Sequence, residues 1–209
     1  MKGRMPVTVD AGYVEHLATN RYFDRTFECD AVKVLPGEYF VTTADMLLVT
    51  VLGSCVTACI RDRDKGLGGM NHFMLPEGSE SGVLSSSARY GAYAMEVLLN
   101  HLLKLGARRS SLEAKVFGGG KVLASLTQAQ VGEKNAQFVL DYLETERIPV
   151  VAQDLLDIYP RKVYFFPVSG RVMMKKLVRV KNDTLIARER EYEARLRRDN
   201  VQGDVELFG

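Results

Sequence analysis

One cysteine of this chain lies at a predicted turn where its sulfur could act as a nucleophile. Cys55 follows Gly53 and Ser54, directly after the apolar run 47–51. Because the thiolate is the reactive form and a free cysteine titrates near pH ~8.5, Cys55 needs a cation or dipole nearby to be largely thiolate at neutral pH. Glycine lets the backbone bend sharply, and the N–H groups of such a bend can face the atom that the thiol attacks. We therefore expect Gly53 and Ser54 to support an oxyanion site beside Cys55.

His72 is the base that the order of the chain supplies. A strand over 56–60, a charged turn and a returning strand over 67–75 would carry His72 back beside Cys55. The imidazole of such a dyad takes the thiol proton and later gives it to the leaving group. A third group must orient the ring. The hydroxyl of Thr50, on the strand that leads to the turn, is the candidate for this role.

The residues alone leave a structural role open for Cys55. Free cysteine is among the most commonly buried residue types, and we expect that role for Cys59, which lies inside an apolar strand. Together with His72, the two cysteines carry the donor atoms of a zinc site. No CxxC pair or fourth ligand stands at ordinary spacing, so we expect no metal. The run Gly118–Gly120 and the lysine after it lack the following Ser or Thr of a phosphate loop, so we expect no nucleotide cofactor.

Composition limits the class of protein. The chain has 209 residues, of which 46% are hydrophobic and 26% charged, which suits one globular domain and excludes an intrinsically disordered chain. The uncharged run 46–60 is shorter than the roughly 20 residues of a spanning helix, and the start of the chain lacks the apolar core of a signal peptide. The three cysteines form no regular disulfide framework. We expect a cytoplasmic protein with free thiols and no membrane insertion.

Charge is unevenly distributed along the chain. The net charge of +2 does not indicate a nucleic-acid binder, and no aromatic stacking motif is present, so we expect no nucleic-acid partner. Residues 175–198 nevertheless hold nine Lys and Arg against four Asp and Glu. This segment has two interpretations, a solvated helix face or a docking surface for an acidic partner.

Strands and helices must alternate to position these residues. Strands are predicted over 47–51, 56–60, 67–75, 112–117, 162–168 and 171–177, with a tight hairpin at Ser169-Gly170. Helices are predicted from Ser86 or Ser87 to a glycine cap at Gly106, over 133–146, and over 184–199 with a narrow apolar stripe of Leu185, Ala187, Tyr192 and Leu196. The chain then divides into an extended N-terminal arm over 1–37, a central domain over 38–180, and a charged C-terminal helix and tail over 181–209. This pattern predicts an α/β fold, a single-domain layered sandwich of packed β-sheets with flanking helices.

Several segments together resemble one known family. They are Val49–Val56, Gly68–Pro76, Arg89–Gly91, Lys115–Gly119, Gly132–Asn135, and Arg161–Val163 through Ser169-Gly170. In this order and spacing they are similar to the chemoreceptor glutamine deamidases, the CheD family. The resemblance extends from about residue 35 to the C-terminus and identifies 38–180 as the catalytic domain.

The resemblance implies an activity and a set of site residues. Family members hydrolyse the side-chain amide of selected glutamines in methyl-accepting chemotaxis receptors, and their fold is similar to that of deamidating toxins that are cysteine hydrolases. By position, the family nucleophile falls on Cys55 and the histidine on His72. The threonine of the family falls on Thr50, although some members carry it one residue earlier, where this chain has Val49. No cofactor is implied.

The resemblance also implies partners and leaves two rival functions. The receptors are the expected substrate, and family members can bind a CheC-type phosphatase. One rival is a non-catalytic chemotaxis regulator that binds receptors or such a phosphatase. The other is a related cysteine amidase or methylesterase that acts on other proteins. The reactivity of Cys55 and the chemistry of the released product distinguish these functions.

Overall fold

Two five-stranded mixed sheets form the body of the protein, and the computed structural model describes residues 16–76, 86–122, 126–178 and 183–198. In order across the first sheet, the strands are β1 (Asn20–Asp24), β2 (Cys29–Lys33), β4 (Leu47–Leu52), β9 (Arg161–Phe166) and β10 (Arg171–Lys176). Across the second they are β3 (Tyr39–Thr42), β6 (Leu67–Asn71), β5 (Val56–Asp62), β7 (Leu112–Gly118) and β8 (Val150–Leu155). The helices are α1 (Ser86–Lys104), α2 (Leu126–Thr145) and α3 (Asp183–Arg198), with a 3₁₀ turn at Arg109–Ser111. The predicted layered α/β sandwich is therefore confirmed.

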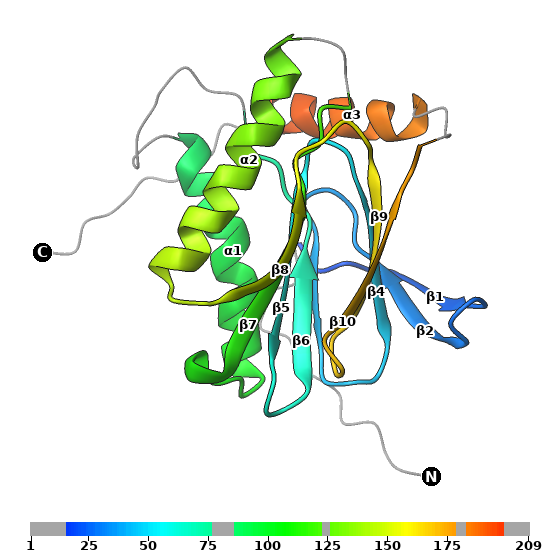
Figure 1. Cartoon of the computed structure of the whole chain (residues 1–209), viewed down its shortest axis with the longest axis vertical. Coiled ribbons are helices and arrows are strands. Elements are labelled where there is room, and N and C mark those ends of the chain that lie inside the picture. The colour runs from blue at the N-terminus through cyan, green and yellow to red at the C-terminus, as the bar shows by residue number, and fades with distance from the viewer. Residues whose placement is uncertain (1–15, 77–85, 123–125, 179–182, 199–209) are drawn as a thin grey trace, which may run out of the picture.

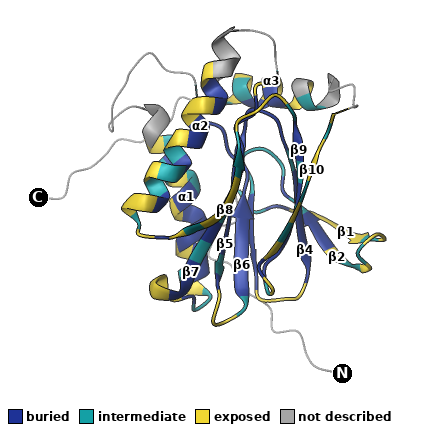
Figure 2. Ribbon diagram, viewed as in Figure 1, coloured by how far each residue is buried: buried dark blue, intermediate teal, exposed yellow. Residues whose placement is uncertain are grey.

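Side chains alternate along β4, and this alternation fills the space between the sheets. Leu48 and Leu52 point toward the second sheet and join a buried cluster that includes Met70. Leu47 and Val49 belong instead to a cluster on the outer face. The helices α1 and α2 cover the outer face of the second sheet. Figure 2 shows that the middle strands of the two sheets are buried. Even-numbered residues of β4 therefore face the interior of the sandwich.

The predicted helices are present, with one earlier start. α1 ends at the expected glycine, since Gly106 has φ +95° and the next residue, Ala107, donates its N–H to the carbonyl of Leu102 at 3.0 Å. α2 begins at Leu126, ahead of the predicted residue 133. Within the described ranges, no helix is long and apolar enough to cross a membrane.

Part of the predicted N-terminal arm is a hairpin. β1 pairs antiparallel with β2, and β2 pairs parallel with β4, so the segment extends the first sheet instead of wrapping around the domain. The carboxylate of Asp24 closes the hairpin turn by accepting the N–H groups of Thr26 and Phe27 at 2.9 and 3.2 Å. The prediction of an extended arm was wrong for this part because β1 lies at the sheet edge with mostly exposed side chains, which weakens its apolar alternation.

Helix α3 lies across one end of the sandwich (Figure 1). Its predicted apolar stripe is correct at Tyr192, which is buried, and at Leu196, which packs against the inter-sheet cluster. Ala187, in contrast, is exposed, and the buried position beside Tyr192 is held by an acidic residue, Glu189. The helix therefore contacts the domain through an edge that contains a carboxylate.

Candidate active site

The chain between β4 and β5 turns at Gly53, Ser54 and Cys55, and a second glycine segment packs directly against this turn. Gly118 ends β7 with φ +117°, and a Cβ atom there would stand 2.2 Å from the carbonyl oxygen of Cys55. The N–H of Gly119 donates to that same oxygen at 2.8 Å. Only glycine permits this approach and this backbone conformation. The backbone of Gly118 and Gly119 therefore packs directly against the cysteine turn.

Asn135 of α2 also holds the cysteine turn, through its side chain. Its side-chain amide donates to the carbonyl of Ser54 at 2.9 Å and accepts the N–H of Leu75 at 2.8 Å. The residue is fully buried, so both hydrogen bonds are shielded from water. Asn135 thus links the cysteine turn to the segment that follows His72. Asn135 belongs to one of the segments that resemble the family, but its role could not be predicted from that segment.

The Thr50 hydroxyl and the His72 imidazole form a buried pair. Thr50 Oγ1 donates to the carbonyl of Val34 at 2.8 Å and lies 2.8 Å from Nδ1 of His72. A hydroxyl has one proton to donate, and here the Val34 carbonyl takes it. Nδ1 must therefore carry the ring proton and donate it to Thr50. The opposite nitrogen, Nε2, is left as an unprotonated base.

The position of His72 relative to Cys55 follows from the strand ladder. The residues next to them, Val56 and Phe73, exchange both backbone hydrogen bonds, at 2.9 and 3.0 Å. Cys55 and His72 therefore flank one ladder pair, and both are buried. Among the described residues, Nε2 of His72 is the one buried side-chain nitrogen or oxygen without a hydrogen-bond partner. The structure brings Cys55, His72 and Thr50 into one region of the interior, whereas Val49 points to the outer face of the sheet.

Burial sets the charge state of the Cys55 thiol and the His72 imidazole. It lowers the pKa of His72 from its ordinary value of 6.5 to about 4. It also raises the pKa of the Cys55 thiol well above its usual range, and the nearby carboxylate of Glu189 raises it further through its charge and a hydrogen bond. In this conformation, the site therefore holds a neutral imidazole and a neutral thiol at neutral pH.

The His72 pKa predicts acid destabilisation. Between pH 6.5 and about 4, the unfolded chain carries a proton on His72 that the folded chain does not, so the free energy of unfolding falls as the pH falls through this window. We expect a loss on the order of a few kcal/mol, at roughly 1.4 kcal/mol per pKa unit. Urea unfolding of the wild-type protein and of His72→Gln between pH 6.5 and about 4 measures this loss in the free energy of unfolding. Equal pH slopes for the two proteins would contradict this account.

Thr50 is expected to act by orienting His72. Thr50→Val keeps the shape of the side chain but removes the oxygen that receives Nδ1–H, so the ring loses its fixed orientation and the rate falls by up to about 10²-fold. Thr50→Ser retains the hydroxyl and should restore most of the rate. Steady-state kinetics of the reaction that depends on Cys55 would show the loss in kcat with KM little changed. Equal losses in the Val and Ser variants would rule out the orienting role.

The N–H groups of the cysteine turn converge on one carboxylate. Oε1 of Glu189 accepts the N–H of Gly53 at 2.8 Å and that of Cys55 at 3.4 Å. Oε2 accepts the N–H of Ser54 at 3.1 Å and the Ser54 hydroxyl at 2.9 Å. The turn therefore offers four hydrogen-bond donors to one pair of oxygens, three of them from Gly53 and Ser54, the residues predicted to support an oxyanion. Glu189 itself was missed, since in the sequence it is one of several acidic residues in a charged helix.

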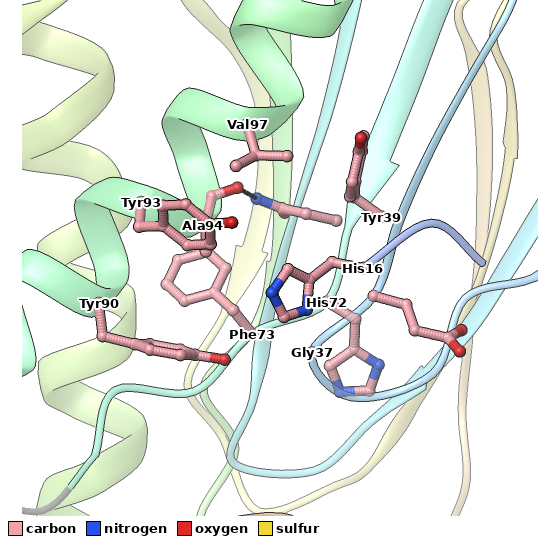
Figure 3. A pocket seen from close by; sticks show the side chains of 11 residues that line it. His16, Gly37, Tyr39, His72, Phe73, Tyr90, Tyr93, Ala94 and Val97 are labelled. Atoms are coloured by element: carbon pink, nitrogen blue, oxygen red, sulfur yellow. Dashed lines mark hydrogen bonds between the residues drawn. The ribbon is translucent and has the colours of Figure 1, made fainter. Parts of the chain in front are cut away.

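His72 also lines a small pocket (Figure 3). His72 and Phe73 line it together with Gly37 and Tyr90, and it has room for about one water molecule, at about 20 Å³. The Tyr90 hydroxyl hydrogen-bonds the hydroxyl of Tyr192 on α3, so the C-terminal helix also borders this side of the site. Across the described ranges, no three His, Cys, Asp or Glu side chains gather as a metal site would require, and Cys59 packs with Met70 between the sheets.

Known proteins resemble this chain over most of its length. It is 67% identical over 196 residues to the "Probable chemoreceptor glutamine deamidase CheD 1" of Dechloromonas aromatica (strain RCB), covering 94% of this chain and 98% of that protein. It is 62% identical over 197 residues to the "Probable chemoreceptor glutamine deamidase CheD" of Methylobacillus flagellatus, covering 93% and 97%. The family model described as "CheD chemotactic sensory transduction" matches residues 74–176. The chain belongs to the CheD family.

Cys55, His72 and Thr50 of this CheD protein precede the segment that the family model matches, but they lie in the part of the chain shared with the full-length relatives. A crystal structure of Bacillus licheniformis hypothetical protein YfiH is also matched, with a TM-score of 0.32 and 12% identity over 57% of this chain and 49% of that one. That likeness is too low to support a structural argument. The site of this CheD is therefore interpreted from its own geometry.

Proposed function

We propose that this CheD protein hydrolyses the side-chain amide of glutamine residues in chemoreceptors and releases glutamate and ammonia. The observation that carries the proposal is the convergence of the N–H groups of Gly53, Ser54 and Cys55 on one carboxylate oxygen pair beside the cysteine. The carbonyl oxygen of a glutamine side chain is a hydrogen-bond acceptor, as each oxygen of this carboxylate is, and it gains negative charge during the reaction. The printed names of the relatives supply the receptor as the substrate class.

The first half-reaction forms a thioester. Nε2 of His72 takes the proton of the Cys55 thiol, and the sulfur attacks the amide carbon. Negative charge then develops on the amide oxygen, where the N–H groups of the turn stabilise it, an effect typically worth about 10²–10³-fold in rate per donor. His72 delivers its proton to the nitrogen as the carbon–nitrogen bond breaks, and ammonia leaves.

The second half-reaction releases glutamate. His72 is again a neutral base, and it takes a proton from a water molecule that attacks the thioester carbon. The carbon–sulfur bond breaks and the proton returns to the Cys55 sulfur. Thr50 receives Nδ1–H throughout, so the ring presents Nε2 to the reacting atoms in both halves. The cycle needs no cofactor.

The proposed chemistry sets the location of the enzyme and its main partner, the receptor. The substrate glutamines lie in the cytoplasmic part of receptors, so the proposal places the enzyme in the cytoplasm. The CheC-type phosphatase implied by the family resemblance stays a prediction, which co-elution of the two purified proteins tests. A regulator that only binds receptors would have no use for a buried imidazole held with one nitrogen free, and this favours the enzyme over the regulator.

The product distinguishes the proposed activity from its rivals. The wild-type protein should release ammonia from a folded receptor cytoplasmic fragment, in amounts equal to the carboxyl groups formed. A methylesterase would release methanol from a methylated fragment instead. Binding of the fragment without release of ammonia would favour the non-catalytic regulator. Ammonia released from unrelated proteins at the same rate would favour a general amidase.

A further inference from the structure

Glu189 on α3 is the kind of side chain that the proposed reaction produces. It is a glutamate presented by a helix, and its carboxylate lies against the cysteine turn with only 3% of the residue exposed. In the described part of the chain, its hydrogen-bond partners are the N–H groups of that turn, the Ser54 hydroxyl and the Cys55 thiol. These are the donors that would hold the oxyanion and then the product carboxylate.

The turn is shaped to admit this carboxylate. A Cβ atom at Gly53 would stand 2.6 Å from Oε1 of Glu189, so the missing side chain at residue 53 makes room for the oxygen. A buried carboxylate is costly unless hydrogen bonds replace its hydration. The turn supplies four donors, namely the N–H groups of Gly53, Ser54 and Cys55 and the Ser54 hydroxyl. A pocket built for packing alone would not need this set of donors.

A second anchor lies one helical turn further along α3. Tyr192 is buried on the same face as Glu189, as the i, i+3 spacing requires. Its ring packs on Gly37, where a Cβ atom would stand 2.9 Å from the tyrosine Cε2. Its hydroxyl bonds to that of Tyr90, beside the pocket that His72 lines. The helix is thus docked through two side chains, Glu189 at the cysteine turn and Tyr192 at Gly37 and Tyr90.

We propose that α3 occupies the substrate-binding site as a built-in analogue of the product, and that a receptor helix reaches Cys55 only after α3 has left. The proposal rests on the proposed function for the nature of the substrate. It adds the mode of recognition, in which the target glutamine is presented by a helix and a side chain one turn away packs at Gly37 and Tyr90. The enzyme is inhibited while α3 is packed against the cysteine turn, because Glu189 occupies the hydrogen-bond donors around Cys55.

The charge on Glu189 reinforces this inhibition. Burial raises the pKa of the Cys55 thiol, and the charge and hydrogen bond of the adjacent carboxylate raise it further, so the docked helix keeps the sulfur protonated. Departure of α3 removes that negative charge from the site and exposes the sulfur to solvent. The nucleophile then becomes available at the moment when the substrate helix can enter.

Glu189→Gln in the full-length chain tests the position of the side chain directly, because it places an amide where the product carboxylate lies. We expect Cys55 to attack this amide carbon. The carbon–nitrogen bond breaks, ammonia leaves with a proton from His72, and water cleaves the thioester to restore glutamate at residue 189. Peptide mass spectrometry of the purified variant should therefore find glutamate or the thioester to Cys55 at this position.

Two internal controls accompany this experiment. In Glu189→Gln combined with Cys55→Ala, the amide at residue 189 should persist. Gln137, exposed on α2, should remain glutamine in both proteins. Suppose that the wild-type protein deamidates receptors but the amide at residue 189 stays intact in the Glu189→Gln single variant. That result would overturn the proposal and leave the proposed function standing. Conversion at residue 189 without any receptor activity would support the product analogue and count against the receptor substrate.

Cys55 alkylation tests whether α3 blocks the site and does not depend on deamidase activity. Glu189→Ala should raise the alkylation rate of Cys55 about tenfold or more, the factor expected when one charge-assisted hydrogen bond is lost. Glu191→Ala changes an exposed acid on the same helix and should leave the rate at the wild-type value. An unchanged rate in Glu189→Ala, with circular dichroism showing a folded protein, would overturn the inhibitory role of α3.

Discussion

A Cys55→Ala variant is expected to release no measurable ammonia from a receptor fragment that the wild-type protein deamidates. The sulfur is the only heavy atom of the protein that bonds to the substrate in the proposed mechanism, and removing the nucleophile of a comparable hydrolase costs about 10⁴-fold or more. The substitution removes one buried sulfur atom and leaves the backbone donors of the turn in place. Binding of the receptor fragment should therefore persist while the chemistry stops. Initial rates of ammonia release measure this effect.

Cys59→Ala is the matched control for this variant. Cys59 is also a buried cysteine, on β5 between the sheets, but it packs with Met70 and takes no part in the turn. We expect its loss to lower the free energy of unfolding by about 1 kcal/mol through lost packing, with the rate of ammonia release retained. A Cys55→Ala variant as active as Cys59→Ala would remove Cys55 from the mechanism.

His72→Gln should lower the rate of ammonia release by roughly 10²–10⁴-fold, the usual contribution of a general acid–base group. Glutamine can still donate to Thr50 through its amide, but it has no basic nitrogen to take the thiol proton. The variant should therefore also lose the part of the pH profile of Cys55 alkylation that depends on the imidazole. Combined measurement of ammonia release and alkylation against pH separates this loss of a base from a loss of folding.

His101→Gln provides the comparison for His72→Gln. His101 is a buried histidine of α1 whose Nδ1 lies 3.1 Å from the Tyr39 hydroxyl, so its replacement perturbs a buried polar contact on the far side of the second sheet. The rate should stay near the wild-type value even where stability falls. A similar drop in rate for both histidine variants would mean that His72 acts through the stability of the core.

The parts of the site that lie close together in the sequence could be predicted from it. Gly53 before Cys55 indicated a sharp turn with exposed N–H groups, because only glycine tolerates the close backbone and carboxylate contacts found there. Thr50 could be predicted only as a hydroxyl on the strand that leads to the turn, and the structure places its oxygen 2.8 Å from Nδ1 of His72. Such local signals come from alternation and backbone sterics, which act over a few residues.

Contacts between distant segments could not be predicted in this way. Gly53 and Glu189 are 136 residues apart, and a glutamate within a charged helix looks like part of a solvated face. Asn135 likewise joins the cysteine turn to Leu75 from the middle of α2. Periodicity reports which face of a helix is apolar, but a buried polar residue runs against that signal and is defined only by the partner it meets.

The most direct test of the account is position-resolved mass spectrometry of a folded receptor cytoplasmic fragment, incubated with the wild-type protein or with Cys55→Ala. The account predicts that particular glutamines become glutamate with the wild-type protein and that the same positions stay glutamine with the variant. Equal conversion by both proteins would contradict the assignment of Cys55 as nucleophile. No conversion by the wild-type protein, with enzyme and fragment both folded and bound to each other, would contradict the proposed activity itself.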